Sequence, residues 1–141
     1  MPVYNQYRQY TDIQGCISVL FGDDMTDKQK IVYDLLISIR PDISIVFSTR
    51  KTWHRYATCW PVHKKIVFYP LIFNYSTEAC LHNALHELAH IIHYETTGKF
   101  GHTEKFKEIL DKLITDYGTP EVKRAKLNTA LGTSIYRGGQ L

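Results

Sequence analysis

The sequence predicts an α+β fold, in which a small antiparallel sheet packs against one long central helix and further helices lie N-terminal and C-terminal to it. Three short runs rich in β-branched and aromatic residues between positions 43 and 69 are typical of strands. After them, apolar residues recur at helical spacing and cover about half the circumference of a helix. A helix with so wide an apolar face belongs in a core, so we expect the sheet to pack on it.

The chain has the length of one domain. With 141 residues, of which 44% are hydrophobic and 22% charged, it is expected to fold as a single domain over residues 1–141. Residues 132–141 are expected to form a flexible tail. The evenly spaced tyrosines of residues 1–14 favour a helical turn that packs on the body, and a flexible end is the alternative.

Composition excludes several classes of protein. No apolar run approaches the roughly 18 residues of a membrane span, and the polar N-terminus lacks the hydrophobic region of a signal peptide. We therefore expect a soluble, intracellular protein of the cytoplasm with no membrane partner. Cys16, Cys59 and Cys80 are odd in number and far apart, which predicts reduced thiols. With 17 basic and 14 acidic residues, the net charge of +3 is too small for a dedicated nucleic-acid-binding protein.

The N-terminal half contains one helix and the strands. The run from residue 16 to 21 is a candidate strand, and a helix is predicted over 27–40, capped by Thr26 or Asp24 and ended by Pro41. The next strands are predicted at 43–48, 53–60 and 65–69. Pro61, Val62 and His63 form the turn of an antiparallel hairpin between the last two strands. Trp53 and Trp60 frame this hairpin and are expected in the core.

The C-terminal half is helical. Ser76 or Thr77 caps the central helix, and Gly98 ends it. A second amphipathic helix follows from Thr103 to Gly118. Thr119 and Pro120 then open a short helix that we expect to reach about residue 131.

The central helix carries the motif HExxH. His86 and His90 lie one helical turn apart on one face, about 6 Å from each other, so their imidazoles can bind a single ion. Glu87 stands where a metal-coordinated water would lie. This spacing predicts a zinc hydrolase with one Zn²⁺ per chain and Glu87 as its catalytic residue.

A catalytic zinc ion usually has three protein ligands and an open position for water. The candidates for the third ligand are His93, Glu95, His102 and Glu104. His93 shares the face of the other histidines but lies about 10 Å along the helix axis from His86. The loop after the helix is long enough for His102 to return to the metal, and Gly98 and Gly101 allow it to reverse. We favour His102, and the other candidates stay open.

Several neighbours are candidates for supporting roles. His93, Tyr94 and Tyr56 could donate a hydrogen bond to the oxyanion or contact the ligands, although residues of this kind are more often half-buried packing residues. His82, one turn before His86, is expected to support the site or to face solvent.

Basic residues gather in two small groups. The groups are Arg50, Lys51, Arg55, Lys64 and Lys65 in the hairpin and Lys123, Arg124 and Lys126 near the C-terminus. A solvated surface explains them, so we expect any nucleic-acid binding to be weak.

The stretch from residue 81 to 109 resembles the SprT-like (Spartan-type) zinc metallopeptidases. Their signature is an HExxH helix followed, after a glycine-containing loop, by a histidine and, four residues on, a Phe or Trp. The matching residues are His86, Glu87, His90, His102 and Phe106. The family often has Gly directly after the third histidine, where this chain has Thr103, which can cap a helix. The resemblance covers about residues 26–117 and implies a minimal catalytic domain with a zincin-like metalloprotease core.

Motif and resemblance together predict a zinc-dependent endopeptidase. Zinc on His86, His90 and His102 would lower the pKa of a water molecule and polarise the scissile carbonyl, while Glu87, as general base, takes the proton and passes it to the leaving amine. The expected partner is a protein or peptide substrate, which adds as a strand to an exposed sheet edge. Two alternatives stay open: a nucleic-acid-dependent protease acting on DNA-bound proteins, as the resemblance suggests, and a non-catalytic, zinc-stabilised module that binds a partner.

Overall fold

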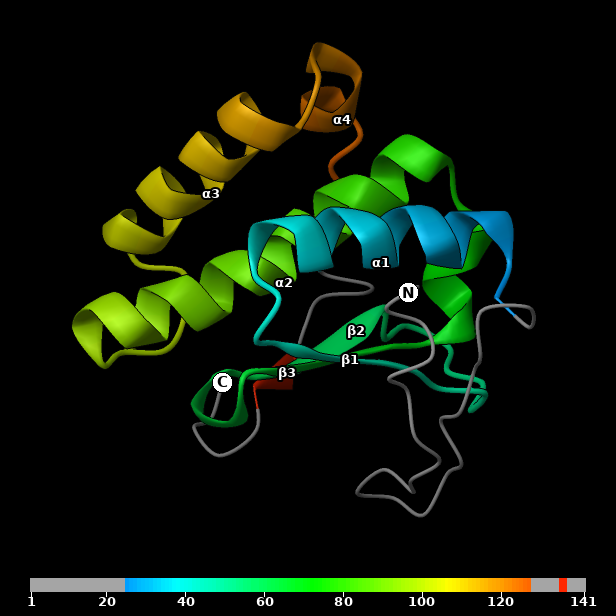
Figure 1. The fold of residues 1–141 in the computed structure, drawn as a ribbon, viewed down its shortest axis with the longest axis horizontal. Coiled ribbons are helices and arrows are strands. Elements are labelled where there is room, and N and C mark those ends of the chain that lie inside the picture. Colours follow the sequence, from blue (N-terminus) through cyan, green and yellow to red (C-terminus); the bar gives the residue numbers. More distant parts are fainter. Residues whose placement is uncertain (1–24, 128–134, 137–141) are drawn as a thin grey trace.

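The molecule is built in layers, with helices on one face of a small sheet (Figure 1). The computed structural model describes residues 25–127 and 135–136. Helices α1 (Asp27–Ile39) and α2 (Thr77–Thr97) lie above strands β1 (Ser44–Phe47), β2 (Ala57–Trp60) and β3 (Lys65–Phe68). Helix α3 (Glu104–Tyr117) lies on α2, on the side away from the sheet. This arrangement confirms the predicted α+β class and the packing of the sheet on the central helix.

The sheet is mixed, so the prediction of a purely antiparallel sheet is wrong in part. The strand order is β1-β3-β2-β4, where β4 is Ile135–Tyr136. Strands β2 and β3 form the predicted antiparallel hairpin, whereas β1 pairs with β3 and β4 pairs with β2 in parallel. Strands β1 and β2 run in opposite directions, as expected, but they do not pair with each other. Strand β3 lies between them, antiparallel to β2 and therefore parallel to β1. Hairpin patterns predict the β2–β3 pair and carry no information on this insertion.

Strand β2 is shorter than predicted. It begins at Ala57, and residues 53–56 precede it without strand structure. The turn to β3 is the short helix η3 (Pro61–His63), which ends at Lys64 with a positive φ of 53°. Trp60 is buried, as expected, but Trp53 is 92% exposed, which corrects its placement in the core. The shortening of the strand explains this error, because Trp53 lies in the loop before β2.

The core lies between the sheet and α1 and α2. Alternate residues of the strands, such as Phe47, Cys59 and Phe68, join Leu36 of α1 and Leu88 of α2 in one buried cluster. Thr26 precedes helix α1 as its N-cap and forms a capping box with Gln29. Burying this cluster is the main stabilising contribution, at roughly 25 cal/mol per Å² of apolar surface.

Helix α2 has the predicted caps. Ser76 accepts a hydrogen bond from the Ala79 amide, and Gly98 ends the helix with a φ of 72°. A short helix not predicted from the sequence, η4 (Pro70–Asn74), leads into it from β3. The Cys80 thiol donates to the Ile72 carbonyl at 3.3 Å, which holds η4 against the start of α2. Within residues 25–127, the two cysteines, Cys59 and Cys80, are free and buried.

The last helix, α4 (Pro120–Arg124), is shorter than predicted. Thr119 caps it as expected, but it ends well before residue 131. The Val122 carbonyl, which would accept a bond from the Lys126 amide in a continuing α-helix, instead receives His82 Nδ1 at 2.8 Å and the Ala125 amide at 3.1 Å. The candidate strand 16–21 and the segment 1–14 lie outside the described residues. Among the helices in the described parts of the chain, none combines the length and apolar character of a membrane span.

Candidate metal centre

Two histidines of the site come from the middle of α2. His86 and His90 are one turn apart, with ring centroids 4.8 Å from each other, and His90 is only 1% exposed. The helix is set in position by the apolar face that it buries against the sheet and α1, so both rings project from a rigid element toward α3. The spacing predicted from HExxH is therefore realised.

The third histidine returns from the loop after α2. Gly98 and Gly101 have positive φ values of 72° and 93°, a conformation that other residues adopt at a cost. Thr103 then caps α3 by accepting a hydrogen bond from the Phe106 amide at 3.2 Å. These turns reverse the chain and bring His102 back to His86 and His90.

The three ring nitrogens converge on one point. His86 Nε2 lies 3.1 Å from His90 Nε2 and 3.3 Å from His102 Nε2, and all three ligand atoms are within 4.8 Å of one another. Two zinc–nitrogen bonds of about 2.0–2.1 Å at a tetrahedral angle separate their nitrogens by about 3.3–3.4 Å. Because neutral imidazoles that point lone pairs at one another repel, the donor set and its spacing fit a shared cation such as Zn²⁺.

Phe106 provides a common packing surface for the three rings. Its ring stacks on His90 with centroids 4.3 Å apart, and the ring centroids of His86 and His102 lie 5.2 Å and 4.8 Å away. Phe106 is 2% exposed and belongs to the hydrophobic core. The aromatic position of the family signature therefore restricts the orientation of each histidine.

The surroundings keep the histidines neutral. Burial, followed by the charges of His102 and His82, lowers the pKa of His86 to about 3. Burial and the neighbouring histidines also hold the pKa of His90 well below its ordinary value, and the pKa of His102 is lowered mainly by burial. Neutral imidazole is the form that binds metal, so no proton has to be displaced from these rings near neutral pH.

Glu87 is a fully buried carboxyl group next to the first histidine. It is 0% exposed, and burial raises its pKa well above the ordinary value. The backbone of this residue is held against β2, because the Cys59 thiol donates to the Glu87 carbonyl at 3.5 Å. A raised pKa increases the proton affinity of a carboxylate, which suits a general base, while a nearby cation favours its ionised form.

The other third-ligand candidates have partners elsewhere. Glu95 pairs with Arg40 at 2.8 Å, Glu104 pairs with Lys107 at 3.2 Å, and His93 hydrogen-bonds to Thr103. Among residues 25–127 and 135–136, the only group that could hold a metal ion is His86, His90 and His102.

The oxyanion candidates also have other contacts. The Tyr56 hydroxyl lies 3.3 Å from that of Tyr75, and burial together with this bond raises the pKa of Tyr56 to about 12. The Tyr94 ring stacks on Phe100 with centroids 5.1 Å apart. The fully buried His93 ring lies against Phe106 and Thr103. An oxyanion role for any of them stays a prediction.

Two further residues, His82 and Lys126, lie near the three histidines. His82 bonds the Val122 carbonyl and so joins α2 to α4. Lys126, assigned from the sequence to a basic surface group, lies close enough for its charge to lower the pKa of His82, His86 and His102. No pattern in the sequence reveals this proximity, because it depends on how α4 returns over α2.

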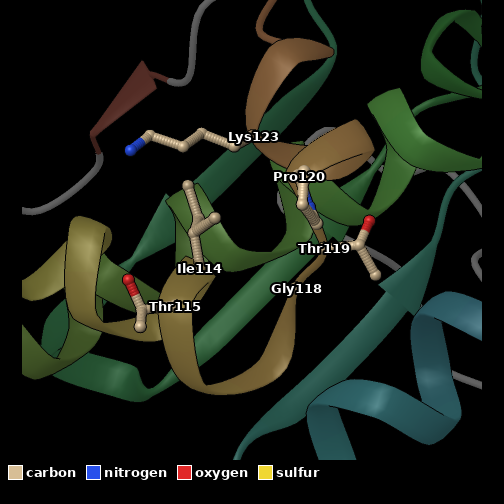
Figure 2. Close-up of a pocket in the computed structure, with 6 residues that line it drawn as sticks. All are labelled: Ile114, Thr115, Gly118, Thr119, Pro120 and Lys123. Carbon is tan, nitrogen blue, oxygen red and sulfur yellow. The ribbon is translucent and has the colours of Figure 1, made fainter.

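Two pockets of the structure lie apart from the three histidines. A groove of about 260 Å³ at the corner between α3 and α4 is lined by Ile114, Thr115, Gly118, Thr119, Pro120 and Lys123 (Figure 2). It lies at the opposite end of α3 from His102, about 20 Å along the helix axis. A second hollow of about 290 Å³ is lined by residues 50–55. Neither contains a metal-ligand candidate discussed above.

The family comparison agrees with the sequence signature. The model of the SprT-like family matches residues 26–132, which include α1, the β2–β3 hairpin and the three histidines. Among solved structures, the chain is similar to the metallopeptidase zymogen abylysin of Pyrococcus abyssi, with 18% identity and a TM-score of 0.46 over 70% of this chain and 85% of that one. The comparison with curated proteins gives no match.

Proposed function

The chain belongs to the SprT-like family, and from this premise we propose that it is a zinc-dependent endopeptidase. The observation that carries the proposal is the convergence of His86, His90 and His102, with Nε2 atoms 3.1 Å and 3.3 Å apart, together with the buried Glu87, which directly follows His86 on α2. Three neutral imidazoles supply a donor set for the metal and the next residue in the motif supplies a carboxyl group for the base, which are the groups that metal-assisted hydrolysis of a peptide bond requires.

Each residue then has a distinct role. Zinc, when bound, supplies Lewis acidity that polarises a carbonyl and makes water a better nucleophile. The three histidines hold the ion, and Phe106 fixes their rings. Glu87 Oε accepts the proton of the attacking water and returns it to the leaving amine nitrogen.

A polypeptide is the proposed substrate. Strand β2 lies against α2 next to Glu87, where the Cys59 thiol contacts the Glu87 carbonyl. Because β2 already pairs with β3 and β4, an extended substrate segment would add by backbone hydrogen bonds to an outer strand of the sheet, which selects little for side chains. We therefore expect broad cleavage of unfolded proteins.

Exchange of Glu87→Gln separates metal binding from catalysis. The variant is expected to retain one zinc per chain and to lose about 10²–10⁴-fold in casein hydrolysis, because the ligands remain and only the base is lost. Glu78→Gln, the same change at an exposed position of α2, should behave like the wild type. Metal analysis and a casein assay on the three proteins provide the test.

The outcomes of this experiment distinguish the alternatives. Full activity in Glu87→Gln contradicts the role of the base. A wild type that binds zinc but hydrolyses neither casein nor itself favours the non-catalytic, zinc-stabilised binding module. A wild type without zinc at stoichiometric supply contradicts the metal centre altogether.

One observation favours a second candidate, a protease that depends on nucleic acid. Trp53 is 92% exposed in a loop that also contains Arg50, Lys51 and Arg55. Exposed aromatic rings among basic side chains are typical of surfaces on which the bases of single-stranded nucleic acids stack. The small number of cations still predicts weak binding at physiological salt.

Single-stranded DNA discriminates between the two candidates. A protease that does not depend on nucleic acid should hydrolyse casein at equal rates with and without an oligonucleotide at about 150 mM salt. A nucleic-acid-dependent protease should be stimulated severalfold, and the stimulation should be lost in Trp53→Ala and in the double variant Lys64→Glu/Lys65→Glu. Tyr117→Ala removes another exposed aromatic residue, on α3, and serves as the control.

A further inference from the structure

His93 and Thr103 join the central helix to the loop that carries the third histidine. His93 lies on α2 almost one turn after His90 and is fully buried, and its Nε2 is 2.7 Å from Thr103 Oγ1. Thr103 directly follows His102 in the chain and caps α3. This hydrogen bond therefore attaches the residue next to His102 to a rigid position on the helix that holds the other two histidines.

The loop needs such an attachment. Positive φ values at Gly98 and Gly101 let the chain reverse, but glycine also gives the loop more alternative conformations to lose on ordering. His86 and His90 are placed by the helix itself, whereas His102 precedes α3 and depends on how the loop is held. His102 itself contacts the His86 ring and packs on Phe106, and the next residue in the chain, Thr103, is held by its bond to His93.

The hydrogen-bonding groups of His93 and Thr103 indicate which of the two residues donates the bond between them. His93 Nδ1 is buried and has no hydrogen-bond partner, so the ring hydrogen is better placed on Nε2, where it meets Thr103 Oγ1. Thr103 Oγ1 then accepts two hydrogen bonds, one from His93 Nε2 and one from the Phe106 amide at 3.2 Å. These two donors fill both lone pairs of the hydroxyl oxygen and fix Thr103 between α2 and the start of α3.

We infer that His93 is a positioning residue that, through Thr103, holds His102 in place for metal binding. It donates to Thr103 and is neither a ligand nor an oxyanion donor, two roles considered for it from the sequence. The inference rests on the proposed function, since it concerns the metal centre. It also explains why a threonine, which has a hydroxyl, can serve where the resembling family often has glycine.

Zinc affinity tests the inference with a cycle of variants. The dissociation constant for Zn²⁺ would be measured by chelator competition on the wild type, His93→Leu, His102→Ala and the double variant, all well below their melting temperatures. His93→Leu is expected to weaken zinc binding about 10-fold, the lower end of what the loss of outer hydrogen bonds costs a metal site. In the His102→Ala background, His93→Leu should have no further effect, because there is no third ligand to place.

Conservative variants separate positioning from general stability. His93→Gln keeps a donor near the Nε2 position, and Thr103→Ser keeps the hydroxyl, so both are expected to bind zinc within about threefold of the wild type. The visible spectrum of the Co²⁺-substituted protein should change in His93→Leu and be restored in His93→Gln. A purely structural role would lower the melting temperature of the metal-free protein and leave the spectrum and the zinc affinity unchanged.

The zinc affinities of these variants either support or overturn the positioning role of His93. Equal weakening by His93→Leu with and without His102 overturns the inference, as does wild-type zinc affinity in His93→Leu. Failure of the wild type to bind zinc contradicts the proposed function instead, so the two failures are distinguishable.

Discussion

The middle of α2 and its C-terminal end use polar residues in opposite ways. In the middle, burial moves the pKa values of the histidines down and that of Glu87 up, so every group is shifted toward its neutral form. At the end, Arg40 of the α1 cap forms hydrogen bonds with Asp42 and Glu95, whose pKa values are both lowered, so these groups are shifted toward their charged forms.

This difference separates a site that is suited to a ligand from a network that is complete by itself. The ions of the second region compensate one another at 2.8–2.9 Å and are partly exposed, which is the arrangement of a structural surface network. In the first region, three neutral rings direct nitrogens at one point, and a cation is what would satisfy them together. Polar clusters held in their neutral forms are therefore the better guide to function in this fold.

Loss of one of the three histidines should have the largest effect on zinc affinity. A small effect would contradict the difference drawn between the two regions of α2. His86→Ala, His90→Ala and His102→Ala are each expected to weaken zinc binding by more than about 100-fold, since even the outer contacts of metal sites contribute 10–100-fold. Arg40→Met should leave zinc affinity unchanged. Chelator competition measures all four, and wild-type affinity in His102→Ala would show that the loop histidine is not a ligand.

Zinc should stabilise the protein through the first region alone. At a free concentration about 1,000 times its dissociation constant, zinc contributes about 4 kcal/mol to the free energy of unfolding, or about 10 °C in melting temperature for a domain of this size. Calorimetry with zinc and with chelator measures the difference. The shift should persist in Glu87→Gln and fall to about a third or less in His102→Ala, since zinc binding there is weakened by more than about 100-fold. An equal shift in both would mean that zinc binds elsewhere.

The ion network should contribute least, and its contribution should depend on pH. Arg40→Met is expected to lower the free energy of unfolding by about 1 kcal/mol at neutral pH, because exposed pairs contribute little. Asp42 and Glu95 have folded-state pKa values below their ordinary 3.8 and 4.5, so their contribution is present above that range and is lost as pH falls through the lowered values.

Denaturant unfolding at several pH values measures this effect. The difference between Arg40→Met and the wild type should shrink below about pH 4, because the carboxylates of the unfolded chain take up protons there while those of the folded protein stay ionised to lower pH. Lys112→Met breaks an exposed pair with Asp116 on α3 and should leave stability unchanged at every pH. A constant difference for Arg40→Met across this range would assign the effect to lost packing of the Arg40 side chain.

Local sequence was sufficient to predict the three long helices, α1, α2 and α3, and the first two histidines of the site. The caps at Thr26, Ser76 and Thr103 and the end at Gly98 depend on residues within one turn of each other. The HExxH spacing likewise depends only on the helical repeat. Such features form wherever the same few residues meet, so their prediction did not require the rest of the chain.

Only the tertiary structure decided which distant residues meet. Contacts between residues far apart in the sequence decide the insertion of β3 between β1 and β2, the bond of His82 to the Val122 carbonyl of α4, and the approach of Lys126 to the histidines. The exposure of Trp53 was likewise visible only in the folded chain. His102 stands between the two cases: the loop length permitted its return and the family signature indicated it, but the packing of α3 on α2 fixes it. A local pattern determines an element and its face, whereas the free energy of burying that face selects its partner.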